Sequence, residues 1–340
     1  MNQPSPKFSS AQSTLRRLRQ STAIRLLRHR VKQAAQWIIL ILSISFMGIA
    51  LWRGSGELQT LNWQACLNAG LLSFFLYLVS LLLQALLWTD IINRLAQTSP
   101  SWHDIEIFCQ AHLARRIPGA VWYLAGRTLF YQDRGIAPVT TLLSSVIEWA
   151  FQLWTAVIVY VSVSYKPAFI AMVYGLSIAA LGTFLALKKV YVDGILRSKH
   201  LSNWLYAILS LLNLRIIVLW LSTSCACWVI AGTILHLVVT AVSTASHYPQ
   251  LSWATSIGIS SFSNGFSQLM SFTGGWGIRE VTLTVLFRPY LPTSLGAAVA
   301  VFVRILYVAG DLVWGGGLWF LSHQLAGQVT QDLPPDLNSH

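Results

Sequence analysis

The chain has 340 residues, of which 55% are hydrophobic and only 10% are charged, and its mean hydropathy is +0.58. A soluble globular domain carries about 25% charged residues, so this composition excludes a soluble protein and indicates a polytopic membrane protein. The net charge of +12 follows mostly from Lys and Arg between the apolar runs, and it gives no reason to expect nucleic-acid binding.

Continuous apolar runs predict an all-α fold, because the alternating pattern of a membrane barrel is absent. A helical span needs roughly 20 apolar residues. The predicted spans are Gln33–Trp52, Leu67–Thr89, Val139–Ser164, Pro167–Leu187, Ile216–Ala241, Ser252–Phe272 and Ser294–His323. Two apolar stretches are too short to cross and are expected to be broken or re-entrant: Ile117–Ala125 and Val281–Phe287. The sequence thus predicts about seven transmembrane helices plus two short broken or re-entrant segments.

This pattern divides the chain into a basic N-terminal segment at 1–32, a membrane domain at 33–323 and a short polar tail at 324–340. Cytoplasmic loops carry more Lys and Arg than external loops. With the N-terminus inside, the cytoplasmic segments, 273–293 included, hold 20 Lys and Arg against two outside. We therefore expect a multi-pass protein of the cell (cytoplasmic) membrane with a cytoplasmic N-terminus and an external C-terminal tail.

The segment 271–280 reads Ser-Phe-Thr-Gly-Gly-Trp-Gly-Ile-Arg-Glu and ends an uncharged membrane stretch. The 63 residues between Arg215 and Arg279 contain no Asp, Glu, Lys or Arg. Glycines permit close backbone approach, and a helix N-terminus beside an Arg suits an anion such as phosphate. The candidates for binding a lipid headgroup here are Arg279, Gly274, Gly275 and Gly277. The alternative is a helix break held by an internal salt bridge.

A second broken segment, Arg115–Arg127, lies in the first half of the chain. Pro118 and Gly119 interrupt a helix there, and Trp122 suits the headgroup interface. The headgroup candidates in this segment are Arg116, Trp122 and Arg127. An interfacial helix with arginines that reach to the surface is the alternative.

Each half of the chain thus has a short Arg-bearing segment followed by a span with a buried charge, Glu148 in the first half and Arg304 in the second. Glycine- or proline-broken segments at matching places in two halves are typical of a transporter site. Ionisable groups at membrane depth are costly and are functional candidates by default. We expect Glu148, Glu280, Arg304 and Asp311 to form one intramembrane polar network, either structural or proton-relaying.

Other motifs favour neither an enzyme nor a metal protein. No nucleotide-binding, zinc-protease or nucleophile-elbow motif is present, so no catalytic residue and no cofactor is expected. Asp104 and Glu106 have the spacing of a metal-binding acid pair with His103 and His112 nearby, but a structural role is the stronger interpretation and no metal is expected. The four cysteines show no disulfide pattern.

These same segments resemble a known family. The order and spacing of Ile117 to Arg127, Glu148, Gly275 to Glu280 and Arg304 are similar to the transmembrane region of lysylphosphatidylglycerol synthases, which defines a flippase-like membrane family. The resemblance covers roughly residues 35–323. It implies a lipid-translocating domain without the soluble aminoacyl-transferase domain. Two departures are Thr273, where relatives often have Pro, and Trp149, where they often have Arg.

The sequence therefore predicts a translocator of an anionic phospholipid or lipid-linked sugar. Two alternatives stay open. One is a glycosyltransferase that uses a polyprenyl-phosphate sugar and would depend on Glu57 in the first external loop. The other is a non-catalytic scaffold for a lipid-modifying enzyme. Expected partners are the lipid, the membrane, and either a second copy of the chain or such an enzyme; nucleic acid is not expected.

Overall fold

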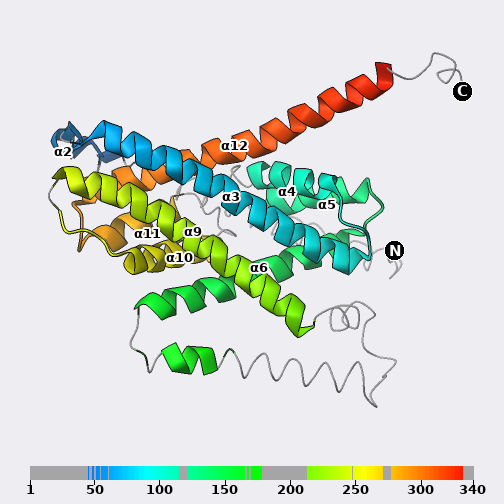
Figure 1. Cartoon of the computed structure of the whole chain (residues 1–340), viewed down its shortest axis with the longest axis horizontal. Helices are drawn as coiled ribbons and strands as arrows, with labels where there is room; N and C mark the ends of the chain where they lie inside the picture. The colour runs from blue at the N-terminus through cyan, green and yellow to red at the C-terminus, as the bar shows by residue number, and fades with distance from the viewer. Residues whose placement is uncertain are drawn as a thin grey trace, which may run out of the picture.

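The computed structural model describes residues 61–114, 121–164, 213–246, 248–270 and 277–331, with short pieces between 45 and 59 and between 167 and 177. The described part of the chain is helical and contains no strand, which confirms the all-α prediction (Figure 1). The helices are α2 Ser55–Gln59, α3 Trp63–Ala96, α4 Trp102–Ala114, α5 Val121–Gln132, α6 Pro138–Ser164, α9 Leu214–Ser246, α10 Trp253–Leu269, α11 Ile278–Phe287 and α12 Thr293–Gln331.

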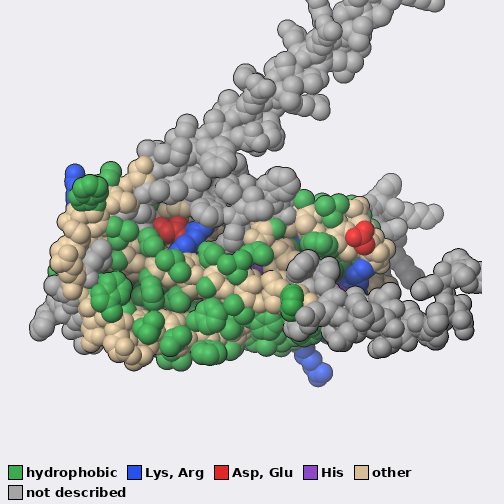
Figure 2. Space-filling view, turned by 90° about the horizontal axis from the view of Figure 1, so that it is seen from above, with side chains coloured by type: hydrophobic (Ala, Val, Ile, Leu, Met, Phe, Trp, Pro, Cys, Tyr) green, Lys and Arg blue, Asp and Glu red, His purple; other side chains and the backbone are tan. Residues whose placement is uncertain are grey.

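Four of these helices are long and apolar enough to cross a membrane: α3, α6, α9 and α12. They coincide with four of the predicted spans. Less than half of each apolar window is buried inside the protein. Large apolar side chains therefore lie on the outside, and Figure 2 shows them spread over a broad face where charged groups are few. A surface of this kind is suited to lipid, so the protein is a helical membrane protein. Gln33–Trp52 and Pro167–Leu187 lie largely outside the described residues.

Two hydrophobic clusters mark the ends of the bundle. At end A, the start of α3, the loop before α10 and the start of α12 share one cluster through Leu61, Leu251, Leu291 and Leu295. At end B, the last turns of α3 and parts of α4, the loop before α6 and α12 share another through Ile92, Ile105, Ile136 and Leu318. Thus α3 and α12 run from end A to end B. Helices α6 and α9 run from end B to end A, since α9 begins against the last turns of α3.

Helices α4 and α5 form a hairpin that enters the bundle from end B and returns there. Asn93, near the end of α3, donates to the Asp104 carboxylate in the first turn of α4 at 2.7 Å. The Tyr131 hydroxyl, in the last turn of α5, donates to the same carboxylate at 3.2 Å and accepts from the Trp88 indole at 3.0 Å. Arg134 also pairs with Asp104. Asp104 therefore fixes both ends of the hairpin to α3.

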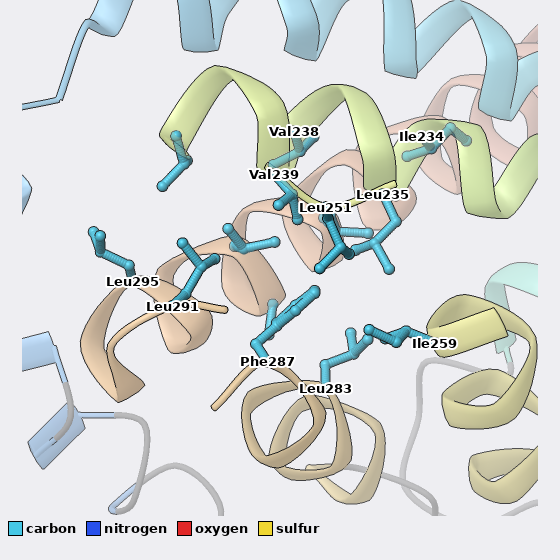
Figure 3. Close-up of a cluster of buried hydrophobic side chains, with 14 of the residues drawn as sticks. Ile234, Leu235, Val238, Val239, Leu251, Ile259, Leu283, Phe287, Leu291 and Leu295 are labelled. Atoms are coloured by element: carbon cyan, nitrogen blue, oxygen red, sulfur yellow. The ribbon is translucent and has the colours of Figure 1, made fainter. Parts of the chain in front are cut away.

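Helices α10 and α11 form a second hairpin, which enters from end A. Along α10, Gly258 lies against Val163 and Ser164 near the end of α6, while Gln268 donates to the Gln152 side chain in the middle of α6 at 3.0 Å. Helix α11 then returns to end A, where Leu283, Phe287 and Leu291 join the cluster in Figure 3. In each hairpin, the first helix thus begins and the second helix ends at the same end of the bundle.

The second hairpin bears on two predictions. The expected span Ser252–Phe272 is not confirmed, because α10 has 17 residues, fewer than the helices that are long enough to cross, and is one arm of a hairpin. Its serines and Gln268 are buried, so its average hydropathy did not indicate what surrounds it. The expectation that 273–293 lies on the same side as 90–138 is not confirmed either, since α11 ends at end A and α4 begins at end B.

The two halves have the same order of elements and opposite directions. The first unit is α3, α4, α5 and α6, and the second unit is α9, α10, α11 and α12. Helix α3 packs against α9, α10 packs against α6, and α4 packs reciprocally against α12. An inverted repeat of this type, with an axis in the membrane plane, is a common architecture of secondary transporters. The echo between the two halves of the sequence has this structural counterpart.

Candidate functional site

The first unit carries a fully buried ion pair between its hairpin and its last helix. An Arg127 Nη1 atom of α5 donates to Glu148 Oε2 of α6 at 2.5 Å, and their side chains are 0% and 2% exposed. The Arg127 guanidinium lies 3.6 Å from the Trp88 ring centroid, 4.2 Å from Tyr123 and 5.1 Å from Phe108. Stacking on aromatic faces compensates part of the desolvation of a buried cation.

Besides Arg127, the Glu148 carboxylate has two weaker hydrogen-bond donors. Gln152 donates to its Oε1 at 3.3 Å, and the Tyr123 hydroxyl reaches its Oε2 at 3.4 Å. Because Gln268 of α10 donates to Gln152, the first ion pair is linked to the second hairpin. Glu148 thus supplies the counter-charge that a fully buried guanidinium requires.

Two hydrogen-bond donors of the first ion pair lack an acceptor. Arg127 Nε and Nη2 are buried and have no hydrogen-bond partner among the residues that the structure describes. A buried donor without a partner costs about 1–3 kcal/mol. Two such atoms beside a membrane-embedded ion pair are suited to a water or an anion that brings its own acceptors.

The second unit carries the corresponding pair with its signs exchanged. Arg304 of α12 donates to Glu280 Oε1 of α11 at 2.5 Å. Their side chains are 18% and 8% exposed, so this pair is more open than the first. Glu280 thus has its counter-charge on the last helix of its unit, as Arg127 does in the first unit.

Arg279 differs from its two arginine counterparts. Its side chain is buried, and its guanidinium lies 4.6 Å from the Tyr307 ring centroid. No ion pair holds it within the described part of the chain, and its Nε lacks a hydrogen-bond partner there. Helix α11 starts next to it at Gly277, whose φ of 83° favours glycine. The Oε1 atom of Glu280 is bonded to Arg304, so Arg279 is a buried cation outside the two ion pairs of the described residues.

A chain of aromatic and polar contacts links the two pairs. Tyr307 stacks on Tyr77 with centroids 4.2 Å apart, and the Tyr77 hydroxyl donates to Asp311 Oδ1 at 2.6 Å. His112 Nε2 lies 3.8 Å from the same oxygen. The His112 ring stacks on Phe108 and meets Tyr123 edge-on, and both of these rings contact Arg127. The contacts therefore run from Arg279 to Arg127 across α12, α3, α4 and α5.

The structure places most of the sequence candidates on this path. Glu148, Glu280, Arg304 and Asp311 do not converge on one point; they form two ion pairs and a separate Asp311 site. Arg127, Arg279 and Gly277 lie where these pairs meet the hairpins. Trp122 belongs to α5, but its side chain is outside the described residues, as are Arg116, Gly274 and Gly275.

Sequence reasoning missed several members of the path: Tyr77, Trp88, His112, Gln152, Gln268 and Tyr307. Two signals could have found them. Tyr307 and Asp311 are four residues apart on one helix face, and Tyr77 is a polar aromatic residue in the middle of an apolar span, away from the interface where tyrosine is common. His112 was considered only as a neighbour of Asp104.

Besides their ion pairs, the two units differ in a hydrogen bond between their first and last helices. Tyr77 and Trp228 occupy the same place counted from the start of α3 and of α9. Where Tyr77 donates to Asp311, Trp228 donates to Thr155 Oγ1 at 3.0 Å. Asp311 follows Arg304 by seven residues, and Thr155 follows Glu148 by seven. Equivalent hydrogen bonds thus join the first and last helices of the two units, one to an acid and one to an alcohol.

Comparison with known proteins found no match to any family model, curated protein or solved structure. The fold and the site therefore define a class, an all-helical membrane protein with an inverted pair of hairpin units. The resemblance to lysylphosphatidylglycerol synthases stays a hypothesis that depends on the motifs alone.

Proposed function

We propose that the protein is a translocator of an anionic phospholipid or a lipid-linked sugar across the cell membrane. The observation that carries this proposal is the pair of buried Arg–Glu contacts, one in each of two oppositely directed hairpin units. Inverted repeats with broken helices that meet inside the bundle support alternating access to one central site.

The energetic cost of the site favours a function over a structural role alone. Replacing a buried ion pair by well-packed apolar residues is often neutral or stabilising. Here the described core holds two such pairs, a further arginine at Arg279 and a further acid at Asp311. Charged side chains at membrane depth are rare and typically mark a substrate or ion path. A fold that needed only stability would not require this many.

In the proposed mechanism Arg279 binds the anionic headgroup. It is buried and stacked on Tyr307, and it is free of the carboxylate that Arg304 occupies. The unpartnered Arg127 nitrogens offer a second contact on the other side of the path. Arg116, Trp122, Gly274 and Gly275 remain proposed headgroup contacts from the segments that join the hairpin helices.

The proposed arrangement in the membrane has six crossings and two re-entrant hairpins. Gln33–Trp52 and Pro167–Leu187 supply the crossings that join the described helices. The segments 1–32, 90–138 and 188–215, which hold most of the Lys and Arg, then share end B as the cytoplasmic side. Both termini are cytoplasmic in this arrangement, and the second hairpin opens to the outside.

The experiment is lipid translocation in proteoliposomes. Fluorescent phosphatidylglycerol and phosphatidylcholine are each placed in both leaflets, and a membrane-impermeant reductant reports the fraction that moves outward. Arg279→Gln should slow the movement of phosphatidylglycerol at least about tenfold, because one lost charge-assisted contact is worth about 1.5–3 kcal/mol. The matched control is Arg288→Gln, an exposed arginine at the end of the same helix.

Two outcomes separate the site from the function. If the wild-type protein moves neither anionic phospholipid nor a polyprenyl-phosphate sugar, the proposed function is wrong. If it moves lipid and Arg279→Gln is as fast as Arg288→Gln, the function stands and the headgroup site is wrong.

A further inference from the structure

Three titratable side chains from three different helices meet in the middle of the path. They are Tyr77 of α3, His112 of α4 and Asp311 of α12, and all three are buried. Asp311 Oδ1 is the common contact, at 2.6 Å from the Tyr77 hydroxyl and 3.8 Å from His112 Nε2. A histidine this close to a carboxylate can take up a proton without leaving an isolated buried charge.

The fold itself does not require titratable groups at these places. The positions related by the inversion, on α9, α10 and α6, hold Trp228, Ser263 and Thr155, where Ser263 matches His112 in its place along the hairpin helix. Thr155 accepts the indole N–H of Trp228, as Asp311 accepts the hydroxyl of Tyr77. An alcohol is therefore enough to hold such a helix contact. Asp311 and His112 therefore add a property that helix packing does not need.

Charge balance suggests what that property is. The two ion pairs and the path between Arg279 and Arg127 contain three arginines, Arg127, Arg279 and Arg304, and three acids, Glu148, Glu280 and Asp311. With neutral His112 these charges cancel. The other two buried acids, Asp104 and Glu106, have partners of their own in Arg134 and His103. An anionic headgroup would add one uncompensated negative charge in a medium where such a charge is costly. Uptake of one proton next to Asp311 restores the balance.

We propose that His112 and Asp311 form a proton-binding site that takes up a proton from water when an anionic headgroup binds at Arg279. This proposal rests on the proposed function, because it needs an anionic ligand in the site. The proton adds to the imidazole, and the imidazolium stays paired with Asp311. Tyr77 and Tyr307 connect the site to Arg279 through one hydrogen bond and two ring contacts.

The neighbouring groups leave His112 as the side chain that titrates. The helices that pack against α4 carry further titratable or charged groups: Tyr77 on α3, Glu106 and Cys109 on α4 itself, Tyr123 and Arg127 on α5, and Tyr307, Arg304 and Asp311 on α12. Glu106 is within reach of His103, and the Cys109 thiol is buried. Tyrosine and arginine ordinarily keep their protons near neutral pH, whereas histidine ordinarily exchanges its proton between pH 5 and 8.

The test measures proton uptake directly. Purified full-length protein in detergent and weak buffer near pH 7 is mixed with short-chain phosphatidylglycerol, and a pH indicator records the protons taken up. Calorimetry measures binding in the same samples, and short-chain phosphatidylcholine is the uncharged comparison. The wild-type protein should take up roughly one proton for each phosphatidylglycerol bound, and its affinity should rise up to about tenfold for each unit that the pH falls.

His112→Gln should lose most of this uptake and the pH dependence of the affinity. The matched control, His236→Gln, changes a half-buried histidine of α9 that contacts Ser256 and not the path, so it should keep both. Asp311→Asn is the second variant and should also lose the uptake, which keeps the test decisive if His112→Gln does not fold.

The outcomes distinguish the two proposals. Binding of phosphatidylglycerol by the wild type without proton uptake, or full uptake by a folded His112→Gln protein, overturns the proton site and leaves the proposed function intact. If phosphatidylglycerol binds no better than phosphatidylcholine at any pH between 5 and 8, the proposed headgroup site fails, and the proton site fails with it.

Discussion

The two inverted units share one scaffold and hold their ion pairs in different surroundings. The Arg127–Glu148 pair of the first unit is 0% and 2% exposed and is surrounded by aromatic rings. The Arg304–Glu280 pair of the second unit is 18% and 8% exposed and lies beside Arg279, a third charge without a counterpart in the first pair. The same geometry thus holds one ion pair closed and leaves the other partly open in the two units.

The largest expected effect tests whether the units are inverted at all. Asp133 follows α5 and Arg288 follows α11, and both side chains are exposed at opposite ends of the bundle. In a background without the four native cysteines, Asp133→Cys and Arg288→Cys should react with a membrane-impermeant maleimide from opposite sides of oriented vesicles. Labelling of both cysteines from the same side would contradict the inverted arrangement and the six-crossing topology.

The next effect compares the stability of the two pairs. Arg127→Ala should destabilise the protein by about 3–5 kcal/mol, because it leaves the Glu148 carboxylate buried without its cation. Arg304→Ala should cost clearly less, since that pair is partly exposed. Unfolding in detergent, monitored by the loss of helical circular dichroism, measures both costs. The double variant Arg127→Met, Glu148→Leu should recover most of the stability that Arg127→Ala loses. Equal costs for Arg127→Ala and Arg304→Ala would contradict the conclusion that the first pair is closed and the second pair is open.

A smaller effect concerns how closely the helices of the second unit approach. A Cβ atom added at Gly232 of α9 would lie 2.4 Å from the Ile257 Cα of α10, which is backbone and cannot rotate away. Gly232→Ala should therefore destabilise by about 1–3 kcal/mol as the hairpin is pushed outward. Gly316→Ala in α12 is the matched control, because nothing lies within 4 Å of its added methyl group. That control should be neutral or stabilise by about 0.5–1 kcal/mol.

Sequence patterns predicted the described crossing helices because lipid selects for uninterrupted apolar length. The same patterns did not resolve Ser252–Phe272, whose buried serines bond to carbonyl oxygens of their own helix while their burial comes from packing that sequence does not show. They identified Glu148 and Arg304 as buried charges and Arg304 as one of two candidate partners of Glu280, but they did not identify Arg127 as the partner of Glu148, since that partner depends on how a hairpin folds back. Trp149 follows Glu148 where an arginine is common in the resembled family, and the arginine that pairs with Glu148 instead comes from α5 as Arg127. Tyr77 and His112 became part of the site only through packing of α3, α4 and α12.

The smallest expected effect separates the helix contact from the charge that one unit adds to it. Thr155→Val removes the hydroxyl that accepts from the Trp228 indole, but the indole still has the Gln152 carbonyl oxygen at 3.2 Å. The cost should therefore be about 0.5–1.5 kcal/mol, the net value of one hydrogen bond, and proton uptake should stay unchanged. Asp311→Asn also keeps an acceptor for Tyr77, yet it should abolish the uptake. If instead Thr155→Val altered the proton uptake as strongly as Asp311→Asn, the two positions would be equivalent in function as well as in geometry. The proton could then not be assigned to the His112–Asp311 contact alone.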